Sequence, residues 1–243
     1  MSRLPRLSAP RAKRSLTPST LISGPALRSS CHCESVVIEI GYQDWTPRAY
    51  RPVWSAMRAF CRDRTEQTAD QIWLLCHQPV FTQGRNGNAE HVLASGDIEV
   101  IPTDRGGQVT YHGPGQIMAY VLFDLKRGGF GIRRLISTLE DSVIDTLAAY
   151  DVEAWSDRSA PGVYTRRGKI SAVGLRVSRG CSYHGVALNV DMDLEPFERI
   201  APCGFADMSV TQLADFGVSP GLDAVAARLG NALTARLAEP SVA

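Results

Sequence analysis

The sequence contains no run of about 18 apolar residues, which is the length that a helix needs to cross a bilayer. Its opening residues also lack the continuous apolar stretch of a secretory signal peptide. These two absences exclude a helical membrane protein and argue against export. We therefore expect one folded unit with a cytoplasmic location, since 44% of the 243 residues are hydrophobic and can build a core.

Acidic residues are missing from the first 30 positions, which carry six basic residues and many serines and prolines. The remaining body then has 20 basic and 25 acidic residues, a formal charge of −5. Residues 1–33 show no amphipathic period, and we expect a disordered basic tail before one domain at 34–243. An organelle transit peptide or an over-long start site are the alternative interpretations of the tail.

Disulfide staples are not expected, although the number of cysteines is even. The chain is long enough to fold without them, and the thiols are scattered through it. The six cysteines are Cys31, Cys33, Cys61, Cys76, Cys181 and Cys203. Cys31-His32-Cys33 has no second ligand pair at matching spacing, so we expect no metal site. Cys61 and Cys76 lie in apolar patterns and are interpreted as buried side chains.

Short β-like runs alternate irregularly with amphipathic helical segments after residue 34. The predicted strands are Val36–Ile40, Ile72–Cys76, Ile98–Ile101, Ile117–Leu125, Lys169–Val177 and Tyr183–Val190. The predicted helices are Pro47–Asp63, Ile132–Tyr150 and Asp223–Leu237. Because the order is not a regular β-α-β alternation, we predict an α/β (α+β) fold with a mixed, largely antiparallel sheet flanked by helices.

The most unusual segment is the glycine-rich stretch from Asp104 to Gln116, which places four glycines among polar side chains directly before an apolar strand. Glycine permits a close approach of the backbone to a ligand, and neighbouring donors can fix the ligand's polar end. A glycine-rich hairpin without a ligand is the alternative. The segment lacks the spacing of a Walker A loop or of a dinucleotide fingerprint, so a nucleotide phosphate cradle is not supported.

Two further residues have the chemistry of a reaction centre. Lys169 begins an apolar strand, where partial burial would lower an amine pKa and make it a base or an ion-pair partner. Cys203 stands between Pro202 and Gly204, which leave its sulfur uncrowded. A catalytic thiol needs a cation or base beside it. Lys169 or a histidine could supply that group, and the histidine candidates are His77, His112 and His184.

Taken together and in this order, these segments resemble the lipoyl(octanoyl) transferase family. The match is carried by RGGQVTYHGPGQ at 105–116, GKI at 168–170, HGVALNV at 184–190 and PCG at 202–204. The segment HQPVFTQG at 77–84 belongs to it as well. The resemblance extends from about Val36 to Leu237, so that only the basic tail lies outside it.

The resemblance implies a fold shared with biotin protein ligases and lipoate ligases, and an acyl transfer through a thioester on Cys203. It places the lysine that lowers the thiol pKa at Lys169. The implied substrate-binding residues are Arg105, Gly106, Gly107, Gln108, Val109, Thr110, Tyr111, His112, Ala172, Val173, Gly174, Gly185, Val186 and Ala187. Ala172 stands where close relatives often have serine, and alanine has no hydroxyl group that could contact a ligand there.

The implied reaction moves an octanoyl group from octanoyl-acyl carrier protein to a lysine of a lipoyl domain. The acceptors would be the lipoyl domains of 2-oxoacid dehydrogenase complexes and the glycine cleavage H protein, with no nucleic-acid or membrane partner. No cofactor and no ATP are expected. The exchange of one thioester for another is nearly balanced in energy, and the later formation of the amide drives the reaction forward. Burial of the octanoyl chain would contribute on the order of 5 kcal/mol at about 0.8 kcal/mol per methylene.

Acidic partners would require a basic rim around the acyl channel despite the acidic body. The rim that we predict from the sequence consists of Lys126, Arg127, Arg133, Arg134, Arg166, Arg167 and Arg179. Three other functions remain open at this point. They are an ATP-dependent lipoate or biotin ligase, a catalytically silent carrier-protein binding module, and a thioesterase in which water resolves the same acyl-enzyme.

Overall fold

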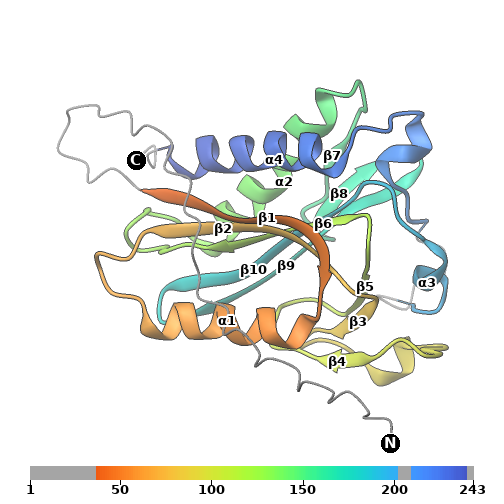
Figure 1. The fold of residues 1–243 in the computed structure, drawn as a ribbon, viewed down its shortest axis with the longest axis horizontal. Coiled ribbons are helices and arrows are strands. Elements are labelled where there is room, and N and C mark those ends of the chain that lie inside the picture. Colours follow the sequence, from red (N-terminus) through yellow and green to blue (C-terminus); the bar gives the residue numbers. More distant parts are fainter. Residues whose placement is uncertain (1–36, 202–208, 240–243) are drawn as a thin grey trace, which may run out of the picture. The chain divides into compact units, whose positions relative to one another are not determined.

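Seven strands form a central sheet in the order β1-β2-β6-β10-β9-β8-β7 in the computed structural model (Figure 1). Their bounds are β1 Ile38–Arg48, β2 Asp70–His77, β6 Gln116–Leu122, β7 Trp155–Ser156, β8 Gly162–Thr165, β9 Gly168–Ser178 and β10 Cys181–Asn189. Only β1 and β2 pair in parallel, and the other neighbours are antiparallel. The structure describes residues 37–201 and 209–239, without the side chains of 42–44, so the predicted tail and Cys203 lie outside the described residues.

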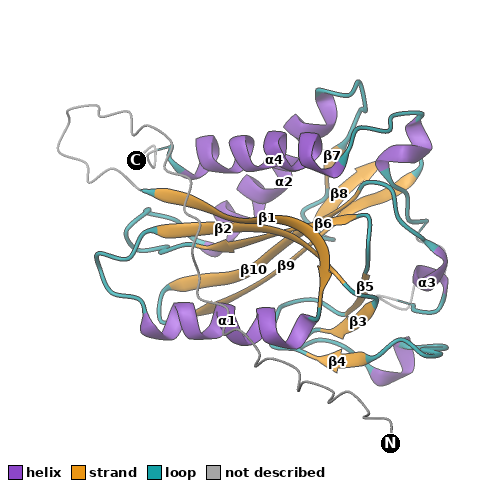
Figure 2. Ribbon diagram, viewed as in Figure 1, coloured by secondary structure: helices purple, strands orange, loops and turns teal. Residues whose placement is uncertain are grey.

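A smaller sheet with the order β4-β3-β5 lies beside the central one (Figure 2). Its strands are β3 Val80–Gln83, β4 Val100–Pro102 and β5 Val109–His112. The α-helices are α1 Tyr50–Asp63, α2 Ile132–Ala148, α3 Glu195–Glu198 and α4 Leu222–Leu237, and short 3-10 turns cover Ala89–His91 and Leu213–Phe216. Helices α2 and α4 cover one face of the central sheet and α1 covers the other (Figure 1).

The larger core lies between the central sheet and the pair α2 and α4. Leu135, Leu139, Val143 and Leu147 recur every four residues of α2, so they share one helix face, and none of them is exposed. They pack with the apolar side of β6 and β10 and with α4. Each buried side chain of this size contributes about 1.5–3 kcal/mol, which makes this layer the main source of stability.

The second core lies between α1 and the opposite face of the sheet. Met57 and Cys61 of α1 pack on β6 and β10, where the Cys61 Sγ lies 2.8 Å from the Cys181 Sγ. Arg64, just after α1, donates to Asp70 at 2.8 Å, and Asp70 is also 2.8 Å from Arg127. This buried carboxylate with two guanidinium partners ties the end of α1 to the start of β2.

The structure confirms the predicted fold class, and every predicted strand and helix overlaps an observed element. Helix α1 begins at Tyr50 rather than at Pro47, because β1 continues through Arg48 and its residues extend the parallel pairing with β2. The four strands without a prediction, β3, β5, β7 and β8, have at most four residues each. Among the described residues, no helix has the length and apolarity required to cross a bilayer.

Candidate active site

The glycine-rich segment forms β5 and the loop before it, which crosses over the central sheet. Gly106 N donates to Leu175 O of β9 at 2.9 Å and so fixes the loop on the open edge of that strand. Gly115 has φ +84°, and a Cβ there would lie 1.8 Å from Asp191 O. Only glycine fits this approach of two backbones, which explains one of the four glycines without a ligand.

A cavity of about 510 Å³, here called the acyl pocket, lies beneath this loop. Its wall includes Lys169 and twelve of the fourteen residues that the family resemblance assigned to substrate binding. These twelve are Arg105, Gly106, Gly107, Gln108, Val109, Thr110, His112, Ala172, Val173, Gly174, Gly185 and Ala187. The volume lies within the range of small-molecule sites, and the lining is mostly apolar.

Tyr111 and Val186 do not line the acyl pocket. The Tyr111 ring packs on Phe81 and Phe197, with ring centroids 5.6 and 5.5 Å away. Val186 is fully buried in the core on the α2 side of β10. Since side chains alternate between the two faces of a strand, one residue of a contiguous motif must point away from the ligand.

A directional chain of hydrogen bonds stabilises the closed end of the acyl pocket. Buried Arg105 donates to the Thr82 hydroxyl from Nε at 3.2 Å and from Nη2 at 2.9 Å. The Thr82 Oγ1 lies 3.2 Å from Nε2 of His112, whose Nδ1 donates to Gln116 Oε1 at 2.8 Å. Among the described residues, Arg105 contacts carbonyl and hydroxyl oxygens and no carboxylate, and burial lowers its pKa.

The three histidines near the acyl pocket are neutral. Burial lowers the pKa of His112 well below its ordinary value and lowers that of His77 to about 4. His77 donates from Nδ1 to Arg48 O at 2.9 Å and accepts from the Tyr120 hydroxyl at 2.6 Å. His112 and His184 line the pocket, and His77 is one layer behind Tyr120. The apolar tail of a ligand would therefore meet uncharged rings.

His184 has an unusual backbone conformation, with φ +61° inside β10. A positive φ is rare for a residue with a side chain and indicates a local constraint. It places the ring beside that of Tyr183, at a centroid distance of 5.0 Å, although neighbouring strand residues normally face opposite sides. Burial lowers the pKa of His184, and its Nε2 donates to Asp104 at 3.0 Å.

Asp104 accepts three hydrogen bonds in the wall behind His184. Besides His184, it accepts from Trp54 Nε1 at 2.9 Å and from the Tyr183 hydroxyl at 2.5 Å. Burial opposes the charge of this carboxylate, but the hydrogen bonds from His184, Tyr183 and Trp54 hold its pKa well below the ordinary value. Asp104 therefore stays ionised and orients His184.

Lys169 lies at the open end of the acyl pocket, where its Nζ donates to Pro161 O at 3.1 Å and lies 5.3 Å from the centre of the Tyr164 ring. The pairing with β8 skips Ile170, so a β-bulge occurs next to the lysine, and such bulges commonly re-aim side chains. Gly162 makes room for the lysine stem, because a Cβ there would lie 2.6 Å from Lys169 Cε.

The two ends of the chain that flank residues 202–208 are anchored near this lysine and near the small sheet. Ser209 O accepts from Lys169 N at 2.9 Å, and Thr211 N donates to Lys169 O at 3.0 Å. Ala201 N donates to His91 O at 2.8 Å. Cys203 itself lies outside the described residues, and a residue six positions after it is hydrogen-bonded to Lys169.

Several pocket residues carry no prediction from the sequence. Tyr50 enters from the first turn of α1, Ile136 from α2 and Phe197 from α3. Met118 and Tyr120 lie on β6 at a spacing of two, so they share the face that also holds Gln116. A polar or aromatic side chain at alternate positions of an otherwise apolar strand is the signal that could have found this face.

None of the seven residues of the predicted basic rim lines the acyl pocket. Arg127 contacts Asp70, Arg166 donates to Glu153 at 2.6 Å, and the Arg134 guanidinium lies 3.8 Å from the centre of the Phe130 ring. Arg179 is separate from these and lies in the turn between β9 and β10.

The described part of the chain contains no group of three or more His, Cys, Asp and Glu side chains arranged to hold a metal ion.

Comparison with known proteins identifies the family. The model of the lipoyl protein ligase A/B catalytic domain matches residues 49–234. The chain is 56% identical over 185 residues to the octanoyltransferase of Thiobacillus denitrificans, covering 76% of this chain and 85% of that protein. It is 55% identical over 189 residues to the octanoyltransferase of Ectopseudomonas mendocina, covering 77% and 92%.

Solved structures show the same fold at low sequence identity. The bipartite lipoate protein ligase of Thermoplasma acidophilum matches with a TM-score of 0.67 at 19% identity, covering 85% of this chain and 84% of that one. Lipoate-protein ligase A bound with ATP gives a TM-score of 0.65 at 18% identity, with 84% of each chain covered. The biotin protein ligase of Aquifex aeolicus gives 0.52 at 14% identity, covering 83% and 70%.

The fold and the site thus define a catalytic domain of the lipoate and biotin protein ligase type, and the predicted fold relationship is confirmed. The chain belongs to the lipoyl protein ligase A/B catalytic domain family. Within it, the relatives at 51–56% identity are octanoyltransferases, which confirms the predicted family and the predicted enzyme class, an acyltransferase. These relatives do not favour the ATP-dependent ligase alternative.

Proposed function

We propose that the chain moves an octanoyl group from octanoyl-acyl carrier protein, through a thioester on Cys203, to a lysine of a lipoyl domain. The acceptors are the lipoyl domains of 2-oxoacid dehydrogenase complexes and the glycine cleavage H protein. The observation that carries the proposal is the polarity of the acyl pocket. Its lining is mostly apolar, the histidine rings in it are neutral, Arg105 is its buried cation, and Lys169 lies at its open end.

The first half-reaction exchanges one thioester for another. The Cys203 thiolate attacks the octanoyl carbonyl, a carbon–sulfur bond to Cys203 forms, and the bond to the carrier's sulfur breaks. Lys169 takes the proton of the Cys203 thiol and passes it to the carrier's sulfur, which leaves as a thiol. Because a free thiol is mostly protonated at neutral pH, a nearby cation is required, and Lys169 is our candidate for this role.

The second half-reaction forms an amide. The lysine amine of the lipoyl domain attacks the Cys203 thioester, the carbon–nitrogen bond forms, and the carbon–sulfur bond breaks. The amine loses a proton in this step, and Lys169 in its neutral form is our candidate to accept it. An amide is more stable than a thioester, so the sequence proceeds without ATP.

The proposal is tested by measuring transfer from octanoyl-acyl carrier protein to a lipoyl domain with and without ATP, for the wild type and for Cys203→Ser. We expect ATP-independent transfer by the wild type and none by the variant. Transfer that requires ATP would contradict the proposal in favour of a ligase. Release of free octanoate without transfer would indicate a thioesterase, and unchanged carrier binding with no turnover by the wild type would indicate a silent binding module.

A further inference from the structure

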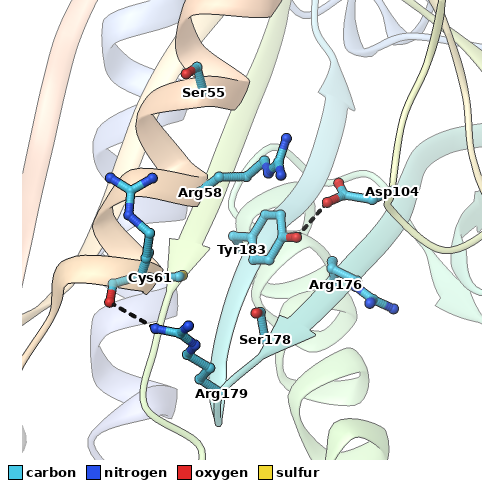
Figure 3. Close-up of a pocket in the computed structure, with 9 residues that line it drawn as sticks. Ser55, Arg58, Cys61, Asp104, Arg176, Ser178, Arg179 and Tyr183 are labelled. Atoms are coloured by element: carbon cyan, nitrogen blue, oxygen red, sulfur yellow. Dashed lines mark hydrogen bonds between the residues drawn. The ribbon is translucent and has the colours of Figure 1, made fainter.

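A second cavity, of about 450 Å³, lies on the same face of the sheet beneath the outer half of α1 (Figure 3). Its wall contains four arginines, with Arg58 and Arg62 from α1, Arg176 from β9 and Arg179 from the turn after β9. Figure 3 shows Arg58 and Arg176 on either side of Tyr183, with Arg179 near the end of the β9–β10 hairpin. We call this cavity the arginine pocket.

The positive charge of the arginine pocket is not neutralised within the described part of the chain. Arg58, Arg176 and Arg179 form no ion pair there, and Arg62 pairs with exposed Asp63 at 2.7 Å. The acid in the lining is Asp104, whose oxygens already accept from Trp54, Tyr183 and His184. Three guanidinium groups without an ion pair in the described residues therefore face the single carboxylate of Asp104, in a body with a formal charge of −5 after residue 30.

Arg179 occupies a position that a large side chain rarely takes. Arg179 and Gly180 have φ +51° and +80°, the pattern of a tight two-residue hairpin turn. Asparagine or glycine is preferred at the first of these positions, because a longer side chain with positive φ is strained. A strained residue that also lines a charged cavity points to a binding role. Arg179 Nη1 donates to Arg62 O at 3.5 Å (Figure 3).

The lining matches a phosphate ester better than a small inorganic ion. The planar guanidinium presents paired donors that fit phosphate oxygens, and hydroxyls of Ser55, Ser178 and Tyr183 add neutral groups to the wall. A volume of about 450 Å³ lies within the range of small-molecule sites, so it leaves space for an organic part next to the phosphate.

We infer that the arginine pocket binds the phosphate of the pantetheine arm that carries the octanoyl group on the donor protein. This inference rests on the proposed function, because it assumes acyl carrier protein as the donor. It assigns the pocket to binding of the donor and leaves bond formation to the open end of the acyl pocket.

The distance between the two cavities fits such an arm, which would pass over the loop at 104–107 because Gly106 N is bonded to Leu175 O of β9 between them. Gly174 lines the acyl pocket, Arg176 lines the arginine pocket, and Lys169 lies seven positions before Arg176. Seven strand residues span about 23 Å between Cα atoms at about 3.3 Å each. An arm with about thirteen bonds between phosphorus and sulfur reaches roughly 15 Å, at the length per bond of an extended chain. The lysine and arginine side chains can cover the remainder.

The experiment compares three donors that differ in one group each. They are octanoyl-pantetheine, octanoyl-phosphopantetheine and octanoyl-acyl carrier protein, assayed with Arg58→Gln, Arg176→Gln and the wild type. We expect the wild type to show a KM about tenfold lower for the phosphorylated thioester than for octanoyl-pantetheine. Both variants should abolish that difference while kcat at saturation is retained. Arg228→Gln, on α4 at the opposite face of the sheet, is the matched control and should preserve the difference.

Three results would overturn the inference. If the wild type and the arginine variants each have the same KM for octanoyl-pantetheine and octanoyl-phosphopantetheine, the pocket does not bind the phosphate. If the variants lose activity only with the carrier protein, the arginines contact its acidic surface instead. If the wild type transfers octanoyl from none of the three donors, the proposed function fails and this inference fails with it, which is distinguishable from the first two results.

Discussion

The acyl pocket and the arginine pocket lie on one face of the same sheet but handle charge in opposite ways. In the acyl pocket, burial keeps His112 and His184 neutral and lowers the pKa of Arg105. In the arginine pocket, Arg58 and Arg179 are exposed and form no ion pair within the described residues. The comparison indicates that the mostly apolar lining of the buried cavity suits an apolar chain, whereas the arginine-rich lining of the more exposed one suits an anion.

The two cavities share one wall, which separates them. Tyr183 and Asp104 line the arginine pocket, and His184 lines the acyl pocket. The positive φ of His184 turns its ring to the side of Tyr183, so that both donate to the same carboxylate. Asp104, which is ionised, therefore lies in the wall between the acyl pocket and the arginine pocket.

The largest expected effect comes from removing the amine of the acyl pocket. Lys169→Met keeps the apolar stem and should lower kcat by about 10²–10⁴-fold with every donor, because a positioned acid–base group contributes that much. This separates chemistry at Lys169 from donor binding at the arginines, which should affect KM. Lys126→Met, at an exposed position, is the control for loss of a lysine. An equal loss in both variants would contradict the assigned role.

The floor of the acyl pocket should not tolerate an added methyl group at Gly185 but should tolerate one at Gly174. A Cβ at Gly185 would lie 2.0 Å from Ala119 O, whereas one at Gly174 would lie 3.2 Å from Arg105 Cδ. Gly185→Ala should therefore lower the free energy of unfolding by about 3–5 kcal/mol, and Gly174→Ala by less than about 1 kcal/mol. Urea denaturation of both variants checks this, and equal losses would show that the backbone contact is not decisive.

Stability should fall as the pH is lowered, because the histidines behind the acyl pocket are buried in the neutral form. The pKa of His77 is about 4 in the folded protein, against about 6.5 in an unfolded chain. Between these values the unfolded state binds more protons, so stability is complete above pH 6.5 and is lost as the pH falls towards 4, by about 3 kcal/mol for this residue. His77→Gln should reduce the slope of the urea stability against pH, and an unchanged slope would contradict a buried neutral His77.

The smallest effect tests the cost of placing an arginine in the β9–β10 turn. Arg179→Asn should raise the free energy of unfolding by about 0.5 kcal/mol, because asparagine tolerates a positive φ. The same variant should raise KM for the phosphorylated donor if Arg179 binds it. A variant that gains stability and keeps its KM would show that the arginine serves neither the turn nor the donor.

The sequence was sufficient for the main elements because their apolar periods are long. Helix α2 buries every fourth residue, and β6 is apolar at most positions, so their patterns are unambiguous. Strands β7 and β8 have two and four residues, too few for a period to be recognised. For the site, the family resemblance supplied residues that the geometry brings together, with Tyr111 and Val186 turned away by strand alternation.

The arginine pocket could not be predicted from any one segment. Arg58 lies on a helix face next to Trp54, and Arg176 lies among apolar residues of β9, and neither carries a motif. They become neighbours only because α1 packs across the β9–β10 hairpin. The positive φ of His184 was equally hidden, because the residue that its ring contacts, Asp104, lies 80 positions away in the chain.

The central claim is that a covalent octanoyl group forms on Cys203. It is tested most directly by intact-protein mass spectrometry after one turnover with octanoyl-acyl carrier protein, followed by peptide mapping and a chase with lipoyl domain in the absence of ATP. We predict an octanoyl adduct on the peptide that contains Cys203, lost on addition of the lipoyl domain and absent in Cys203→Ser. An adduct on another residue, or transfer by Cys203→Ser at the wild-type rate, would contradict the account.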